Sequence, residues 1–219
     1  MRVIYEDNHC IAVIKPHGQL TQSDSTGDRS LMDEVREMIR NRDGKPGAVF
    51  LGLLHRLDRP VGGIVLFAKT GKGASRLSEQ FRSRRIVKTY LAVAEGRPTG
   101  DSGTVRQWLV KDRGRNVVRS VPKNYAGAKE AVTDWRVVSE NGGRSLLEIG
   151  LKTGRAHQIR SALSSLGTPI LGDLKYGSRN PMGEAIALFA CGLVFFQPVT
   201  GEAVRLQAEP ELQAFLPFA

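Results

Sequence analysis

The chain has little cysteine and no long apolar run. Cys10 and Cys191 are the two cysteines among 219 residues, too few for a disulfide framework or a cysteine zinc site. The longest uncharged stretch, 185–204 with Glu202 near its end, contains glycine, glutamine and proline. It predicts two short strands rather than a membrane span. No apolar leader follows Met1, and we therefore expect a cytoplasmic protein without a membrane partner.

Acidic residues are also scarce. The chain has 22 Asp and Glu against 32 Lys and Arg, a formal net charge of +10. Neutralisation of phosphates supplies most sequence-independent affinity for nucleic acids. A nucleic acid is therefore the leading partner, although a merely soluble basic protein fits the charge about equally well. DNA binding is disfavoured because the sequence has no helix-turn-helix or zinc-finger signature.

Apolar periodicity predicts more strands than helices. The expected strands are 3–5, 10–15, 50–55, 63–69, 86–95, 105–110, 116–121, 130–138, 145–152, 186–196 and 203–207. The expected helices are 30–40, a segment that begins after Thr70, and 155–166, with a terminal helical turn at 210–216. Most connections are too short for crossover helices, which favours an α+β fold with a mixed, largely antiparallel central sheet flanked by helices. We expect one domain over 1–219, which can consist of two lobes.

The most informative stretch is HRLDRPVGG, residues 55–63. It places the carboxylate of Asp58 between Arg56 and Arg59, at a turn between two apolar runs. A carboxylate held among fixed positive charges stays ionised and can act as a nucleophile or a base. The alternative is a turn aspartate that merely pairs with an arginine.

A second motif, KTGRAHQIR at 152–160, begins the helix expected over 155–166. His157 and Arg160 are three residues apart and would share a helix face away from its apolar stripe. A basic surface at a helix start suits a phosphate or a carboxylate. Spacing alone favours a solvated polar face instead.

The segment 103–129 combines glycine with many basic residues. This composition indicates a mobile, cationic insertion. A solvated hairpin without a partner fits the sequence nearly as well.

HRLD at 55–58 resembles the signature of the RluA family of pseudouridine synthases, which isomerise uridine in ribosomal or transfer RNA. Further segments match in the same order: 5–18, KTY at 88–90, HQIR at 157–160 and 169–177. The matches extend over almost the whole chain. The resemblance implies the pseudouridine synthase catalytic fold, an RNA substrate and neither a metal nor an organic cofactor. We also expect no N-terminal S4 RNA-binding domain, and a monomer.

The resemblance implies a role for each matching residue. Asp58 is the catalytic aspartate that attacks a flipped-out uridine. Tyr90 stacks on the base and assists proton transfer, and Arg160 pairs with the aspartate and orients it. The residues expected to contact RNA or support the site are Arg56, which would fill the space left by the base, Lys88, Arg155 and His157.

Some positions depart from the family pattern. Val61 and Gly62 stand where the family usually has Thr-Ser, so two hydroxyls are absent or replaced. Phe189 and Gln197 stand where histidines are common, and Lys152 occupies a place often taken by arginine. These departures bear on substrate preference. Two other functions stay open, a non-catalytic RNA-binding or ribosome-assembly protein and a hydrolase of a small anionic substrate.

Overall fold

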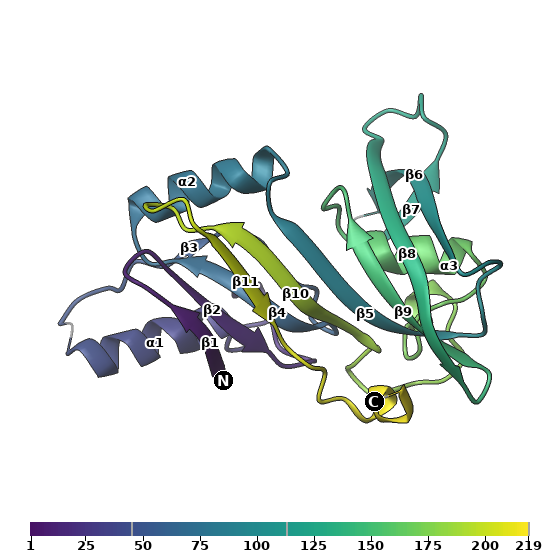
Figure 1. The fold of residues 1–219 in the computed structure, drawn as a ribbon, viewed down its shortest axis with the longest axis horizontal. Coiled ribbons are helices and arrows are strands. Elements are labelled where there is room, and N and C mark those ends of the chain that lie inside the picture. Colours follow the sequence, from purple (N-terminus) through teal and green to yellow (C-terminus); the bar gives the residue numbers. More distant parts are fainter. Residues whose placement is uncertain (45, 113, 219) are drawn as a thin grey trace. The chain divides into compact units, whose positions relative to one another are not determined.

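The structure is a computed structural model that describes residues 1–44, 46–112 and 114–218. The chain forms two compact units (Figure 1). Unit 1 comprises Met1–Val87 and Ala190–Glu209, and unit 2 comprises Lys88–Phe189 and residues 210–218. Each unit combines strands with helices, which confirms the α+β class.

Unit 1 is built on antiparallel strands. Its strands are β1 (Arg2–Glu6), β2 (Cys10–Lys15), β3 (Gly52–Leu53), β4 (Gly62–Ala68), β10 (Leu188–Phe196, from Ala190 on) and β11 (Ala203–Gln207). They lie in the order β1-β2-β4-β10, with β11 paired to β10 and β3 paired to β4. The pairs β1–β2, β2–β4, β3–β4 and β10–β11 are antiparallel. Its helices are α1 (Leu31–Asp43) and α2 (Gly71–Arg82).

Both helices of unit 1 begin where the sequence predicts. Ser30 caps α1 in a capping box with Asp33. The hydroxyl of Ser30 accepts the backbone N–H of Asp33, and the carboxylate of Asp33 accepts the backbone N–H of Ser30. Thr70 caps α2 by accepting the N–H of Gly73 at 3.0 Å. The apolar residues of both helices face inward, with Leu31, Val35, Ile39 and Leu77 buried.

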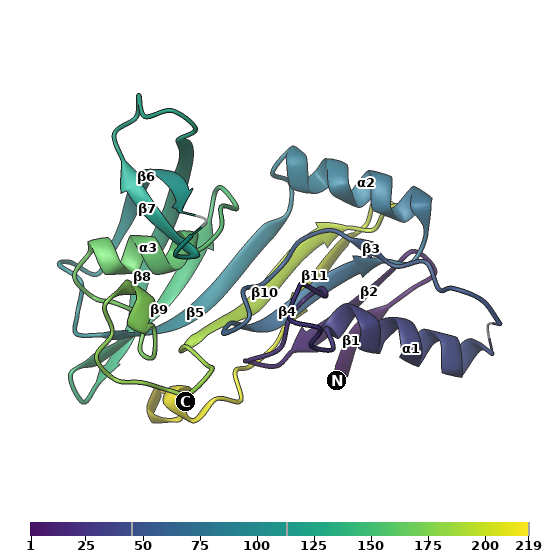
Figure 2. The same ribbon diagram turned by 180° about the vertical axis from the view of Figure 1, so that it is seen from behind.

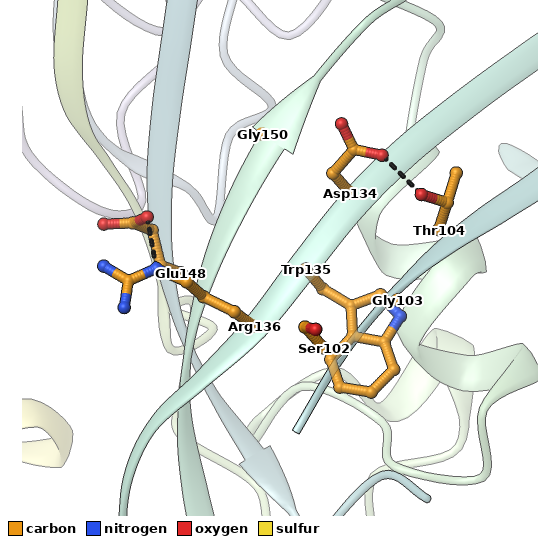
Figure 3. Close-up of a pocket in the computed structure, with 8 residues that line it drawn as sticks. All are labelled: Ser102, Gly103, Thr104, Asp134, Trp135, Arg136, Glu148 and Gly150. Carbon is orange, nitrogen blue, oxygen red and sulfur yellow. Dashed lines mark hydrogen bonds and ion pairs between the residues drawn. The ribbon is translucent and has the colours of Figure 1, made fainter. Parts of the chain in front are cut away.

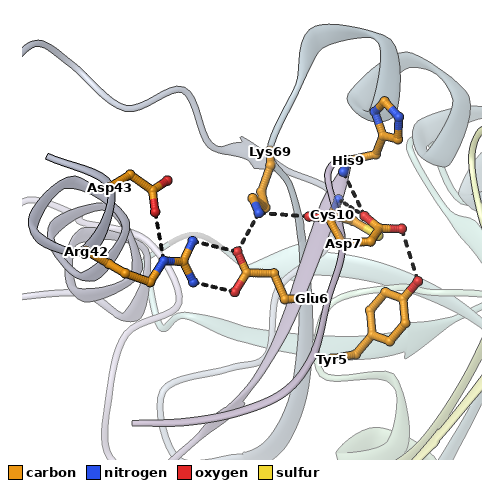
Figure 4. A network of polar contacts seen from close by, with 8 residues as sticks. All are labelled: Tyr5, Glu6, Asp7, His9, Cys10, Arg42, Asp43 and Lys69. Carbon is orange, nitrogen blue, oxygen red and sulfur yellow. Dashed lines mark hydrogen bonds and ion pairs between the residues drawn. The ribbon is translucent and has the colours of Figure 1, made fainter. Parts of the chain in front are cut away.

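Glu6 ties the first hairpin to α1 (Figure 4). Its carboxylate accepts two hydrogen bonds from Arg42, at 2.7 and 2.9 Å, and a further one from Lys69. The bonds from Arg42 lower the pKa of Glu6 to about 2, assisted by Lys69 and opposed by burial.

Unit 2 is also antiparallel. Its strands are β5 (Val87–Glu95), β6 (Ser102–Asp112), β7 (Val117–Val121), β8 (Lys129–Asn141) and β9 (Arg144–Leu151), in the order β5-β9-β8-β6-β7. The helix α3 (Gln158–Ser165) packs against β6, β7 and β8 (Figure 2). Two short 3₁₀ turns complete the unit, η1 (Leu174–Tyr176) and η2 (Gln213–Phe218). The expected largely antiparallel sheet is therefore confirmed.

Several predicted boundaries differ from the structure. The terminal turn expected at 210–216 lies at Gln213–Phe218, and the strand expected over 105–110 extends over Ser102–Asp112. The helix expected from residue 155 begins at Gln158, because His157 has a left-handed backbone (φ 49°). The side chain of Gln158 also holds the preceding loop, since its Oε1 accepts bonds from Thr153 and from the N–H of Arg155. The strand expected over 50–55 shrinks to Gly52–Leu53.

The basic segment 103–129 folds into the hairpin of β6 and β7 and the connection to β8. The β6–β7 pairing shows that this segment contains a hairpin, and its mobility and its contact with a partner stay predictions. Among the described helices, none is long and apolar enough to cross a membrane.

Candidate active site

Asp58 occupies a tight turn just before β4, in which the N–H of Val61 donates to the carbonyl of Asp58 at 3.0 Å. The residue before it, Leu57, is buried. The hydroxyl of Thr21 donates to the carbonyl of Leu57 at 2.9 Å and accepts its N–H at 3.2 Å. With its neighbour fixed on both backbone groups, the backbone that carries the half-buried Asp58 is held in place.

Lys15 also stabilises this turn. Its side chain is fully buried, and its ammonium group donates to the carbonyls of Pro16, Gln19 and Arg59 at 3.0, 2.7 and 3.1 Å. Burial lowers the pKa of Lys15 to about 7, and the charge of Asp58 opposes this shift. Three carbonyl acceptors use all three ammonium protons, so this geometry stabilises the charged form.

The two arginines beside Asp58 differ. Arg59 is a structural residue, because its Nε donates to the carbonyl of Gly18 at 3.0 Å and its Nη1 to Asp28 at 2.7 Å. The N–H of Gly18 returns a bond to the carbonyl of Arg59 at 2.9 Å. Arg56 is exposed, as a residue that contacts RNA would be.

The glycines at the start of β4 are packed too closely to carry side chains. A Cβ on Gly62 would lie 2.5 Å from Cε1 of His17, so the imidazole occupies the space of the missing side chain. A Cβ on Gly63, whose φ is +121°, would lie 2.7 Å from the Cα of Ala190. The space that a serine side chain would fill at position 62 is therefore occupied by the imidazole of His17. His17 lies on the loop whose carbonyls accept hydrogen bonds from Lys15.

In unit 2, Arg160 is buried in an ion pair. Its Nε and Nη2 donate to the two carboxylate oxygens of Asp173, each at 2.7 Å. The exposed fractions of the two side chains are 6% and 1%. The expectation of a polar helix face away from the core is wrong here, because Asp173 supplies a buried partner that local spacing does not reveal. The guanidinium also lies over the ring of Tyr176, 4.8 Å from its centroid.

Tyr90 and Lys88 share one face of β5, since they are two residues apart in a strand. Tyr90 is 7% exposed and pairs in register with Ile149 of β9. The ammonium group of Lys88 lies 3.1 Å from the position that a Cβ on Gly154 would take. Burial lowers the pKa of Lys88. Lys88 therefore meets the loop that leads into α3.

The remaining predicted residues also belong to unit 2. Arg155 is exposed and donates from Nε to the carbonyl of Glu130 at 3.0 Å. Nδ1 of His157 lies 2.8 Å from the hydroxyl of Tyr176. The structure thus brings His157 and Arg160 together around Tyr176. Asp58 and Arg56 belong to unit 1, and the pairing of Arg160 with Asp58 that the resemblance implies stays a prediction.

Four residues that shape these sites were not singled out from sequence for a role: Lys15, Thr21, Asp173 and Tyr176. Three of them, Lys15, Asp173 and Tyr176, lie inside the segments 5–18 and 169–177 that resemble the family, and this position could have indicated a role for them. Thr21 stands in a polar loop with no local pattern, so its contact with Leu57 could not be found from sequence.

A hollow on the strands of unit 2 is a different feature (Figure 3). Its charged side chains bond to neighbours, Arg136 to Glu148 at 2.8 Å and Asp134 to Thr104 at 2.7 Å. Because these pairs satisfy each other, we do not place chemistry there. Among the described residues, no group of three or more His, Cys, Asp or Glu side chains is arranged to hold a metal ion.

Comparison with known proteins gives a consistent result. The family model described as RNA pseudouridylate synthase matches residues 9–165. A Bacillus subtilis protein named uncharacterized RNA pseudouridine synthase YhcT is 32% identical over 94% of this chain and 67% of its own length. Ribosomal large subunit pseudouridine synthase C of Rickettsia bellii is 35% identical with the same coverage. The solved structure of human RNA pseudouridylate synthase domain containing 4 superposes with a TM-score of 0.80 at 25% identity, covering 96% of this chain and 89% of that one.

Proposed function

The chain belongs to the RNA pseudouridylate synthase family, and we propose that it is an RluA-type enzyme in which Asp58 is the nucleophile. Isomerisation of uridine to pseudouridine in RNA follows from the family. The attacking residue and the class of RNA are the proposal.

The observation that carries the proposal is the way in which Asp58 is held. Thr21 fixes both backbone groups of Leu57, and Lys15 holds the carbonyl of Arg59. The two neighbours of Asp58 are therefore locked while its side chain stays half-exposed. A nucleophile held in one geometry has little entropy left to lose as it attacks.

The reaction rearranges bonds without a net loss of atoms. The target nucleotide leaves its stack, which costs a few kcal/mol, and Asp58 attacks it. The glycosidic bond from nitrogen breaks, the uracil turns, and a bond from carbon 5 of the base to the same sugar carbon replaces it. The bond that Asp58 formed with the nucleotide then breaks, which returns the free carboxylate. The hydrogen on carbon 5 leaves as a proton, and the base nitrogen that was bonded to the sugar gains one.

Other residues serve this step in the proposal. The ring of Tyr90 stacks on the everted base and its hydroxyl assists proton transfer, while Arg160 orients Asp58. Arg56, exposed beside the turn, fills the space that the base leaves. Lys88, Arg155 and His157 support the RNA backbone near α3, and the excess of basic residues supplies phosphate contacts.

We propose ribosomal or transfer RNA as the substrate, a cytoplasmic location and a monomer in which both units belong to one catalytic domain. The name of the Rickettsia bellii relative refers to the large ribosomal subunit, which supports ribosomal RNA. The family match includes residues of both units, which supports one domain.

The test is replacement of Asp58. Pseudouridine mapping of total RNA, with and without the gene, identifies the target. Asp58→Asn should then lose turnover on that RNA by at least about 10³-fold while RNA affinity stays within a few-fold, because removal of a nucleophile removes the covalent step. Asp101→Asn, a change at an exposed acid, is the matched control and should retain activity.

The alternative is a non-catalytic RNA-binding or ribosome-assembly protein. It would bind RNA without forming pseudouridine in the unmodified chain, and Asp58→Asn would then change nothing that is measured. Equal loss of binding and turnover in a folded Asp58→Asn protein would argue against a nucleophilic role.

A further inference from the structure

The hydroxyl of Tyr176 connects two parts of unit 2. It accepts the N–H of Val118 at 2.7 Å and lies 3.2 Å from the carbonyl of the same residue. Val118 is part of β7, in the basic hairpin (residues 102–121). The same hydroxyl lies 2.8 Å from Nδ1 of His157, the residue just before α3.

These three contacts use the whole capacity of the hydroxyl. A tyrosine hydroxyl has one proton to donate and two lone pairs that accept. It accepts the Val118 N–H, donates to the Val118 carbonyl and accepts one more bond, so all three form together when Nδ1 of His157 carries a proton.

His157 makes this contact from a left-handed backbone. Its φ of 49° lies in the left-handed region, which few residues other than glycine adopt, asparagine, aspartate and histidine being the most frequent exceptions. Arg160 follows one turn later in α3, with its guanidinium over the ring of Tyr176. Tyr176 therefore contacts the start of the helix and its arginine at the same time.

The hairpin on the other side of Tyr176 is strongly cationic. Residues 102–121 contain five basic side chains and one acid. Lys111 is exposed and stands opposite Val118 in the β6–β7 register. Arg119, the next residue of β7, is exposed and lies over the ring of Tyr125. Such a strip of cations and aromatic rings suits the phosphates and bases of RNA.

We propose that Tyr176 is a positioning residue that couples the basic hairpin to Arg160. RNA bound to the hairpin would then fix the guanidinium of Arg160 in the orientation that turnover needs. The proposal rests on the proposed function. Its physical basis is that β7 and the residue just before α3 bond to one buried hydroxyl, so a displacement of Val118 must move His157 or break a bond.

Tyr176→Phe tests the coupling, because it keeps the ring under Arg160 and removes the hydroxyl alone. We expect kcat to fall about tenfold, as for a buried network that loses its central group. The dissociation constant for RNA should change less than threefold, since no charge is lost. A lower melting temperature with unchanged kcat would show that Tyr176 is merely structural and would overturn the proposal.

A double-mutant cycle with Lys111→Ala measures the connection itself. Lys111→Ala should weaken RNA binding and lower kcat/KM. If hairpin and arginine communicate through Tyr176, the combined effect with Tyr176→Phe should be smaller than the product of the single effects. The control cycle pairs Tyr176→Phe with Lys72→Ala, an exposed change in α2, and should be multiplicative. Multiplicative behaviour in both cycles would reject the coupling.

His157→Gly provides an independent variant if Tyr176→Phe is too unstable to assay. Glycine adopts a φ of 49° without strain, so the backbone is kept while the bond to the hydroxyl is lost. A reduced kcat with retained folding is expected, and wild-type kcat would contradict the proposal. Failure of the unmodified chain to form pseudouridine would instead reject the proposed function, so the two failures are distinguishable.

Discussion

The guanidinium of Arg160 and the carboxylate of Asp173 form two hydrogen bonds of 2.7 Å inside unit 2. Both side chains are almost fully buried. A buried ion pair of this kind is costly to break from one side, because the remaining charge has neither water nor a partner. Arg160 consequently has a structural role in addition to the one proposed for it in the reaction.

Arg160→Ala should therefore lower the free energy of unfolding by about 3–5 kcal/mol. The double variant Arg160→Met with Asp173→Leu removes both charges and should regain most of that loss. If Arg160 also acts in the reaction, the double variant stays inactive although it is stable. Denaturant unfolding and turnover of both proteins decide the matter, and full activity in the stable double variant would show that the arginine is structural alone.

Gly63→Ala should destabilise the chain. The added methyl group would meet the backbone of Ala190, and the φ of +121° is strained for any residue with a Cβ. We expect a loss of at least about 1–3 kcal/mol from backbone strain. Gly71→Ala is the control, because a Cβ there meets nothing within 4 Å. Equal melting temperatures for the two variants would contradict this account.

Gly62→Ser should displace His17. The new Cβ would lie within 2.5 Å of the imidazole, and overpacking of this kind costs about 1–3 kcal/mol. His17→Ala with Gly62→Ser should recover stability, because it exchanges the imidazole for the side chain that is usual in the family. Thermal unfolding of the single and double variants measures the coupling, and strictly additive effects would show that the two positions are independent.

The contribution of Glu6 should depend on pH. Its pKa in the folded chain is about 2 against an ordinary value of 4.5, so the folded state favours the ionised form. The resulting stabilisation is complete above about pH 4.5 and is lost as the pH falls toward 2. The melting temperature of Glu6→Gln should therefore lie below that of the unmodified chain at pH 6 and approach it near pH 2. Glu209→Gln, at an exposed position, should show no such trend.

Much of the architecture could be predicted from local sequence. The caps at Ser30 and Thr70, the buried stripe of α1 and the largely antiparallel strands all follow from local rules. These rules depend on residues within a few positions of one another, which is why they hold before the fold is known. The start of α3 could not be predicted, because local rules do not show that His157 has a left-handed backbone and contacts Tyr176, 19 residues away.

The sequence by itself determined the family, the reaction and the identity of the aspartate that we propose as nucleophile, since ordered motifs carry that information without coordinates. Tertiary structure alone decided the environment of each charged group. It buried Lys15 with its ammonium group bonded to three carbonyls and paired Arg160 with Asp173. It also brought Thr21 into hydrogen-bond contact with Leu57, 36 residues away. Solvation and long-range partners fix the role of a charge, and neither is written in the spacing of neighbouring residues.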